Sequence, residues 1–179
     1  MRLFTGLELP ATLTWDLAAL QGGLPGARWI EPSDFHITLA FVGDVSPSVA
    51  RELAEMLGRV EKPRLSLRLT GLDVFGSRKP SSIQVKVGSD SALAALQASH
   101  VSILRRLGVP VEKRRYQPHV TLARIAQCRP VDIARFMERA GGVFTPPFPV
   151  ERFVLYSARD SVGGGPYLAE ETYPLKEAA

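Results

Sequence analysis

A six-residue pattern occurs twice in this chain, about half a chain apart, and limits the possible folds more than any other feature. It reads His-Ile-Thr-Leu-Ala-Phe at 36–41 and His-Val-Thr-Leu-Ala-Arg at 119–124. The 179 residues include three histidines, so two of the three lie in the same sequence context. The repeat indicates an internal duplication, in which residues 1–179 form a single domain of two similar lobes.

Each copy of the pattern has the composition of a β-strand. Ile, Val and Thr favour strands, in which residues two positions apart lie on the same face. His36 and Thr38 therefore share one face, and so do His119 and Thr121, while the intervening aliphatic residues point to the other face. A lone histidine of this kind is usually a satisfied core residue, but its repetition favours a shared functional role.

Hydrophobic periodicity predicts the other elements. Strands are expected at 2–9, 27–31, 36–42, 64–75, 83–87, 119–125, 149–159 and 167–175, helices at 10–20, 46–60, 90–107 and 130–140, and a glycine-rich turn at 163–166. Antiparallel hairpins that alternate with single helices are typical of α+β proteins. We therefore predict a duplicated bilobal α+β fold, with two antiparallel sheets facing a central cleft and the helices packed outside.

The third histidine and the single cysteine are predicted to be structural. His100 lies on or beside the apolar stripe of its helix and has no threonine two residues later. Cys128 is the only cysteine, which excludes an intramolecular disulfide and a thiolate metal cage.

Two facing histidines have the chemistry for acid and base catalysis, because the unperturbed imidazole pKa is about 6.5. A neutral imidazole takes a proton from an attacking water, and a protonated one delivers a proton to the departing oxygen on the opposite side. Such in-line displacement suits a phosphodiester. Thr38 and Thr121 would donate hydrogen bonds to the non-bridging phosphate oxygens. The residues alone leave the roles of His36 and His119 interchangeable.

A zinc site is the competing interpretation, since two histidines are half of a common ligand set. No carboxylate or thiol lies beside either motif, and the nearest carboxylates are Asp34 and Asp44 in the loops that flank the first copy. We therefore expect neither a metal nor another cofactor.

Charge and hydropathy indicate the partners and location. The net charge is +4 and the isoelectric point about 9.5, which favours polyanionic partners. The N-terminus lacks a charged leader with an apolar segment, and no apolar run reaches membrane-spanning length. We expect a cytoplasmic monomer with no membrane attachment and no obligate protein partner.

The paired H-x-T-x motifs resemble those of the two-histidine phosphoesterase superfamily, and in particular the bacterial and archaeal RNA 2′,3′-cyclic phosphodiesterases, once called 2′-5′ RNA ligases. The likeness covers nearly the whole chain. It includes Arg28-Trp29-Ile30 and Pro32 before the first motif, Tyr116-Gln117-Pro118 before the second, and Ser157 with Gly165-Pro166-Tyr167. The resemblance implies metal-independent opening of an RNA-terminal 2′,3′-cyclic phosphate to a 2′-phosphomonoester, with His36 as proton donor and His119 as proton acceptor.

The resemblance also implies substrate-binding roles for three further residues. Phe41 would stack on the terminal base, Arg124 would bind phosphate, and Tyr116 would line the substrate site. Strict strand alternation, however, turns Phe41 and Arg124 away from the histidines, so they reach the cleft only where the strand ends, twists or bulges. Otherwise they are a core phenylalanine and a surface arginine.

Several alternatives remain open from the residues alone. The same site would suit a 2′-5′ RNA ligase or a phosphodiesterase for small cyclic nucleotides, and a non-catalytic RNA-end binding module would use the histidines only to hold phosphate. Five basic residues either track the RNA backbone or form a solvated surface. They are Arg78, Lys79, Lys113, Arg114 and Arg115.

Overall fold

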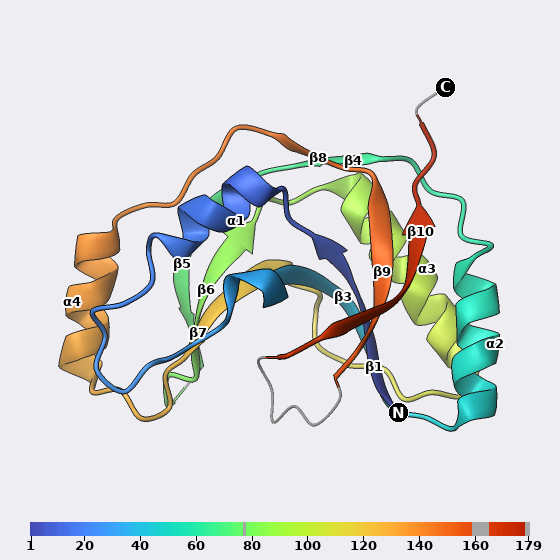
Figure 1. Ribbon diagram of the computed structural model, residues 1–179, viewed down its shortest axis with the longest axis horizontal. Helices are drawn as coiled ribbons and strands as arrows, with labels where there is room; N and C mark the ends of the chain where they lie inside the picture. The colour runs from blue at the N-terminus through green and yellow to red at the C-terminus, as the bar shows by residue number, and fades with distance from the viewer. Residues whose placement is uncertain (77, 159–164, 178–179) are drawn as a thin grey trace.

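The computed structural model describes residues 1–76, 78–158 and 165–177 (Figure 1). The strands are β1 (Arg2–Glu8), β2 (Arg28–Trp29), β3 (His36–Asp44), β4 (Leu65–Leu67), β5 (Leu69–Phe75), β6 (Ser82–Val87), β7 (His119–Arg124), β8 (Phe148–Val150), β9 (Arg152–Ser157) and β10 (Leu168–Pro174). The helices are α1 (Ala11–Ala18), α2 (Pro47–Leu57), α3 (Ser91–Arg106) and α4 (Pro130–Ala140), with a 3₁₀ turn at Pro32–Asp34. No helix in these described ranges is long and apolar enough to cross a bilayer.

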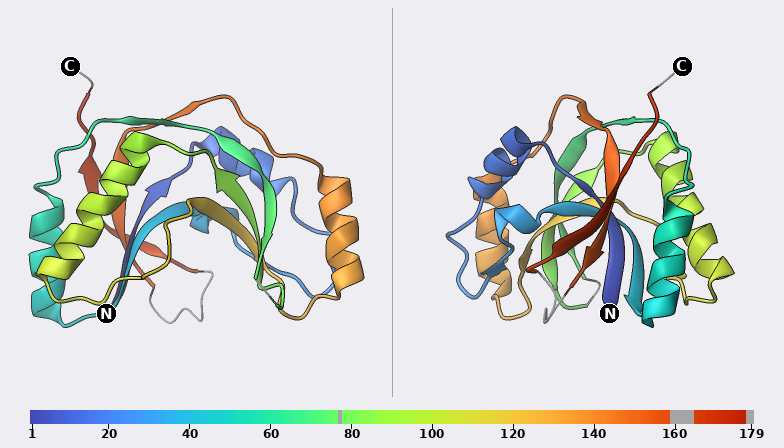
Figure 2. Two further views of the ribbon diagram at one scale, coloured as in Figure 1. Left: turned by 180° about the vertical axis from the view of Figure 1, so that it is seen from behind. Right: turned by 45° about the vertical axis from the view of Figure 1, so that its right-hand side comes forward.

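The central feature is an eight-stranded antiparallel sheet in the order β10-β9-β1-β3-β7-β6-β5, with β2 paired to β7. The two motif strands, β3 and β7, are neighbours and pair through Ile37 and Val120. This pair joins the two predicted antiparallel sheets edge to edge, and Figure 2 shows that the joined sheet arches over a concave face. The predicted α+β class with antiparallel sheets is confirmed.

The helices lie outside the arch, as predicted (Figures 1 and 2). Helices α2 and α3 cover the side formed by β1, β3, β9 and β10, whereas α1 and α4 cover the side of β5, β6 and β7. Side-chain caps begin α2 and α3, because Ser46 and Asp90 accept hydrogen bonds from the amides of Val49 and Leu93. Since α1 and α2 belong to the first half of the chain and α3 and α4 to the second, each lobe combines a helix from each half.

The core lies between the sheet and these helices. One large apolar cluster contains inward residues of every long strand, such as Leu7, Ile37, Val85 and Val120, all fully buried. Its burial fixes which face of each motif strand points inward, so the histidines and threonines face the concave side. A second, smaller cluster of Phe4, Val154 and Tyr156 lies apart from it.

Two predicted strands are each divided in the structure. The segment 64–75 changes partner at Arg68, since β4 pairs with β8 in a separate two-stranded sheet while β5 pairs with β6. The segment 149–159 divides at Glu151 into β8 and β9. The alternation of apolar and polar residues indicates which face of a strand is buried but not which strand it pairs with. The sequence therefore did not predict either division. Ser77, Arg159 and the predicted turn residues Gly163 and Gly164 lie outside the described residues.

Candidate active site

Both motif strands contain a β-bulge at the leucine of the repeated pattern. Between β1 and β3, Thr5 pairs with Ala40 and Gly6 with Thr38, which leaves Leu39 unpaired. Between β6 and β7, Ile83 pairs with Ala123 and Gln84 with Thr121, which leaves Leu122 unpaired.

An extra residue reverses the alternation of side chains along a strand. Because each bulge follows the threonine, Phe41 and Arg124 turn to the same face as the histidines. Both line the cleft, and the Phe41 side chain is 57% exposed.

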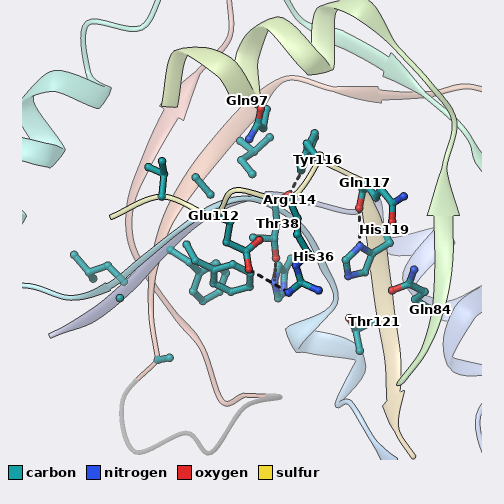
Figure 3. Close-up of a pocket in the computed structure, with 18 of the residues that line it drawn as sticks. His36, Thr38, Gln84, Gln97, Glu112, Arg114, Tyr116, Gln117, His119 and Thr121 are labelled. Atoms are coloured by element: carbon teal, nitrogen blue, oxygen red, sulfur yellow. Dashed lines mark hydrogen bonds and ion pairs between the residues drawn. The ribbon is translucent and has the colours of Figure 1, made fainter. Parts of the chain in front are cut away.

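The concave face holds a cleft of about 720 Å³ to which both lobes contribute. Its lining includes all seven site residues predicted from the sequence, namely His36, Thr38, Phe41, Tyr116, His119, Thr121 and Arg124. Figure 3 shows His36 and Thr38 next to each other, and His119 and Thr121 on the neighbouring strand. The fold thus brings the two copies of the motif to one cavity.

The two imidazoles are held in the same way. Nδ1 of His36 lies 2.8 Å from the carbonyl oxygen of Asp34, and Nδ1 of His119 lies 2.8 Å from the carbonyl oxygen of Gln117. A carbonyl oxygen only accepts, so Nδ1 carries the hydrogen in both rings. Nε2 is therefore the atom of each histidine that exchanges a proton with anything bound in the cleft.

His36 is enclosed by aromatic rings. The ring centroids of Phe4, Tyr167 and Tyr156 lie 4.9, 5.2 and 5.8 Å from that of His36. Tyr167 meets the imidazole edge-on at 90°. These side chains exclude water from one side of the imidazole while Nε2 remains directed at the cleft.

This enclosure sets the charge state of His36. Burial lowers its pKa below the ordinary value of 6.5, the hydrogen bond to Asp34 partly opposes this, and the charges of His119 and Arg124 lower it further. His36 is therefore neutral near pH 7. Its Nε2 lies 3.0 Å from Oγ1 of Thr38, whose hydroxyl donates to the neutral ring.

Tyr116 connects the two motifs. Its hydroxyl donates to the carbonyl oxygen of Thr38 at 2.8 Å, and burial raises its pKa, which keeps the hydroxyl protonated. The segment that precedes the second motif is thereby fastened to the strand of the first. The Tyr116 hydroxyl is engaged by the backbone, and the ring lines the cleft.

The residues near the C-terminus that carry the family resemblance lie beside the first motif. The amide of Tyr167 donates to the Asp34 carboxylate at 3.1 Å. Gly165 has a φ of +89°, and a side chain there would collide with the same carboxylate. This segment therefore supports the loop whose Asp34 carbonyl orients His36.

The described residues contain no group of three or more His, Cys, Asp or Glu side chains placed to hold a metal ion. Asp34 is the carboxylate that acts electrostatically on His36, and one carboxylate with the two imidazoles does not form such a group among these residues.

Comparison with known proteins identifies the family. The family model described as LigT like Phosphoesterase matches twice in succession, at residues 7–84 and 85–167. The chain belongs to this family. One match covers each half of this LigT-like phosphoesterase, which agrees with the duplication seen in the motifs and in their bulges.

Curated relatives carry the name RNA 2′,3′-cyclic phosphodiesterase. The protein from Aeropyrum pernix is 38% identical over 109 residues, which are 60% of this chain and 61% of the relative. The protein from Bacillus subtilis is 32% identical over 127 residues, 68% of this chain and 69% of the relative. The alignments therefore span roughly three fifths to two thirds of these relatives.

Solved structures have the same fold over all or nearly all of the chain. A crystal structure of a protein from Thermus thermophilus has a TM-score of 0.85 at 22% identity and covers 100% of both chains. E. coli LigT complexed with 3′-AMP has a TM-score of 0.76 at 25% identity and covers 98% of both chains.

Two site residues of this LigT-like phosphoesterase were not singled out from the sequence, and they occupy equivalent positions in the two lobes. Gly6 pairs with Thr38, and a Cβ there would lie 3.0 Å from the Ile37 carbonyl oxygen and 3.4 Å from the His36 ring. Gln84 pairs with Thr121, is 3% exposed, and its Oε1 has no hydrogen-bond partner among the described residues. Figure 3 shows Gln84 beside Thr121 and His119. Only the strand pairing reveals both positions.

Proposed function

We propose that residues 1–179 form one catalytic domain that hydrolyses RNA-terminal 2′,3′-cyclic phosphate to a 2′-phosphomonoester without a metal ion. The observation that carries this proposal is the matched pair of imidazoles that line one cleft, each with Nδ1 bound to a backbone carbonyl so that Nε2 is the atom left for proton transfer. Membership of the family and the names of the curated relatives support the same activity.

In the proposed reaction, Nε2 of His119 removes a proton from water, and the water oxygen bonds to phosphorus. The bond from phosphorus to the 3′ oxygen breaks, and Nε2 of His36 gives its proton to that oxygen. The hydroxyls of Thr38 and Thr121 donate hydrogen bonds to the non-bridging oxygens, where charge accumulates. The assignment of donor and acceptor follows the family resemblance.

The donor role requires His36 to gain a proton when the substrate binds. A phosphate anion beside the ring favours the charged imidazolium and so raises the pKa that burial had lowered. The bound substrate thus favours the acid form of His36, which burial alone disfavours.

This charge coupling is open to direct measurement. NMR titration of the free protein is expected to show a His36 midpoint below 6.5, and saturation with a nucleoside 2′-phosphate is expected to move it upward. Replacing Arg124 with Gln should also raise the midpoint of the free protein, because one charge that lowers the pKa is removed. A His36 midpoint at or above 6.5 in the free protein would contradict the proposed origin of its charge state.

Three residues complete the proposed substrate site. The exposed ring of Phe41 would stack on the terminal base, and the Arg124 guanidinium would bind the phosphate through charge-assisted hydrogen bonds. Tyr116 would contact the substrate only with its ring, because its hydroxyl is bound to Thr38. The complex of E. coli LigT with 3′-AMP supports nucleotide binding by this fold.

The test is an assay on an oligoribonucleotide with a 2′,3′-cyclic phosphate end, in buffer that contains EDTA. We expect the cyclic end to be converted to a 2′-phosphate, identified by ³¹P NMR of the product. The same oligonucleotide with a linear 3′-phosphate, and 3′,5′-cyclic AMP, serve as controls and should remain unchanged. Loss of activity in EDTA, or a 3′-phosphate product, would contradict the proposal.

A further inference from the structure

We propose that Phe75 and Arg114 form a second base-binding subsite, for the nucleotide that precedes the cyclic terminus. The inference rests on the proposed function and extends it, because it assigns the site to an oligonucleotide and not to a mononucleotide.

Phe75 is an exposed aromatic side chain inside the cleft. It ends β5, its side chain is 40% exposed, and it lines the same cavity as the two histidines. An exposed aromatic ring in a cleft that binds a polyanion can serve as a stacking surface, because every base has a π-face.

The strand register places Phe75 in line with the proposed phosphate ligand. Phe75 pairs with Ser82 across β5 and β6, and Ser82 pairs with Arg124 across β6 and β7. Residues opposite each other in antiparallel strands share a face, and neighbouring strands lie about 4.8 Å apart. Phe75 is therefore about 10 Å from the backbone of Arg124, beyond the terminal phosphate and within reach of the next nucleotide.

Arg114 supplies the second part of the subsite. Its guanidinium carbon lies 5.8 Å from the centroid of the Phe75 ring, and its side chain is 74% exposed. Glu112 forms an ion pair with it at 3.7 Å, and Figure 3 shows both side chains at the cleft. When RNA binds, a base can take the place of the guanidinium on the Phe75 ring, or it can stack on the guanidinium itself. In either case the guanidinium can also bind a phosphate.

Charge around Phe75 agrees with an RNA chain as the occupant. Arg78 and Lys79 follow Phe75 in the hairpin loop and are exposed, and Arg115 lines the cleft beside Arg114. The β5–β6 hairpin that carries Arg78 and Lys79 lies at one end of the sheet order, whereas Phe41 is in β3, two strands away from β6. The terminal base on Phe41 and the preceding base on Phe75 would therefore extend in different directions from the catalytic histidines.

The test compares kcat/KM for a dinucleotide that ends in a 2′,3′-cyclic phosphate with kcat/KM for the corresponding nucleoside 2′,3′-cyclic phosphate. We expect the wild-type protein to prefer the dinucleotide, and Phe75→Ala to lower the ratio of the two values about tenfold, the effect of losing one stacked base. Phe75→Trp should keep the ratio, because the stacking surface remains. Arg114→Gln should lower the ratio and weaken its dependence on salt.

Phe144→Ala is the matched control, because Phe144 is 74% exposed and does not line the cleft. It should leave the ratio at the wild-type value. An unchanged ratio in Phe75→Ala, or an equal loss on both substrates, would overturn the second subsite while leaving the proposed function intact. Failure of the wild-type protein on both substrates would contradict the proposed function and the subsite together.

Discussion

Replacing either His36 or His119 with alanine is expected to lower kcat on a 2′,3′-cyclic oligonucleotide by roughly 10²- to 10⁴-fold, the usual effect of removing a general acid or base. In the proposed mechanism both Nε2 atoms act in the chemical step, so the loss in kcat should be much larger than the loss of affinity for the product. Single-turnover kinetics and equilibrium binding of a 2′-phosphate oligonucleotide separate the two effects. Because each histidine is needed in one protonation state, the wild-type pH profile should be bell-shaped between about pH 5 and 9.

The chain provides its own control in the third histidine. His100 is 1% exposed and does not line the cleft. Its hydrogen bond is to the buried hydroxyl of Thr5. His100→Gln should retain wild-type kcat near pH 7. Circular dichroism at the same pH is the check that the variant is folded. Turnover that survives in either His36→Ala or His119→Ala would remove the acid and base assignment.

The second large effect is expected on stability, and it arises from His100. Its Nδ1 lies 2.8 Å from Oγ1 of Thr5, its ring meets Phe153 edge-on at a centroid distance of 4.6 Å, and its Nε2 has no partner among the described residues. Burial lowers the pKa of His100 from 6.5 to about 4. The folded protein therefore keeps this ring neutral at pH values where the unfolded chain protonates it.

The direction of the effect follows from proton binding. Between pH 6.5 and about 4 the unfolded chain binds a proton at His100 that the folded protein does not. The stabilisation is complete above pH 6.5 and is lost as the pH falls, by about 3 kcal/mol in total. Urea unfolding at several pH values measures it, and His100→Gln should show a smaller decrease over this range than the wild-type protein. Equal decreases in both proteins would contradict the assignment to His100.

Much of the active site was predictable because a strand has a fixed period. The repeated spacing of His and Thr placed His36 with Thr38 and His119 with Thr121 on matching faces, and the buried residues between them fixed which face points inward. The duplicated α+β fold followed from the same repeat together with the alternation of strands and helices.

The remaining features depend on contacts between distant segments. The bulges at Leu39 and Leu122 arise from the pairing with β1 and β6, and nothing in the repeated pattern itself indicates them. The aromatic enclosure of His36 comes from β1, β9 and the residue before β10, which are far apart in sequence. Consequently the charge state of His36 could not be predicted from the sequence, whereas the structure shows that burial lowers its pKa.

The cleft geometry also clarifies what Phe41 and Arg124 do in the structure. From alternation alone they pointed away from the histidines, and the additional residue in each strand turns them back. The same sixth position therefore carries an aromatic ring in one lobe and a guanidinium in the other. The duplication preserves the pair of histidines while its two copies diverge in the proposed contacts with base and phosphate.

A crystal structure with a bound nucleoside 2′-phosphate, the expected product, would test the convergence of the two imidazoles most directly. We expect one phosphate within hydrogen-bond distance of Nε2 of both His36 and His119, with the hydroxyls of Thr38 and Thr121 on its non-bridging oxygens. A phosphate bound by only one of the two imidazoles, or bound outside the cleft, would contradict a shared acid and base site.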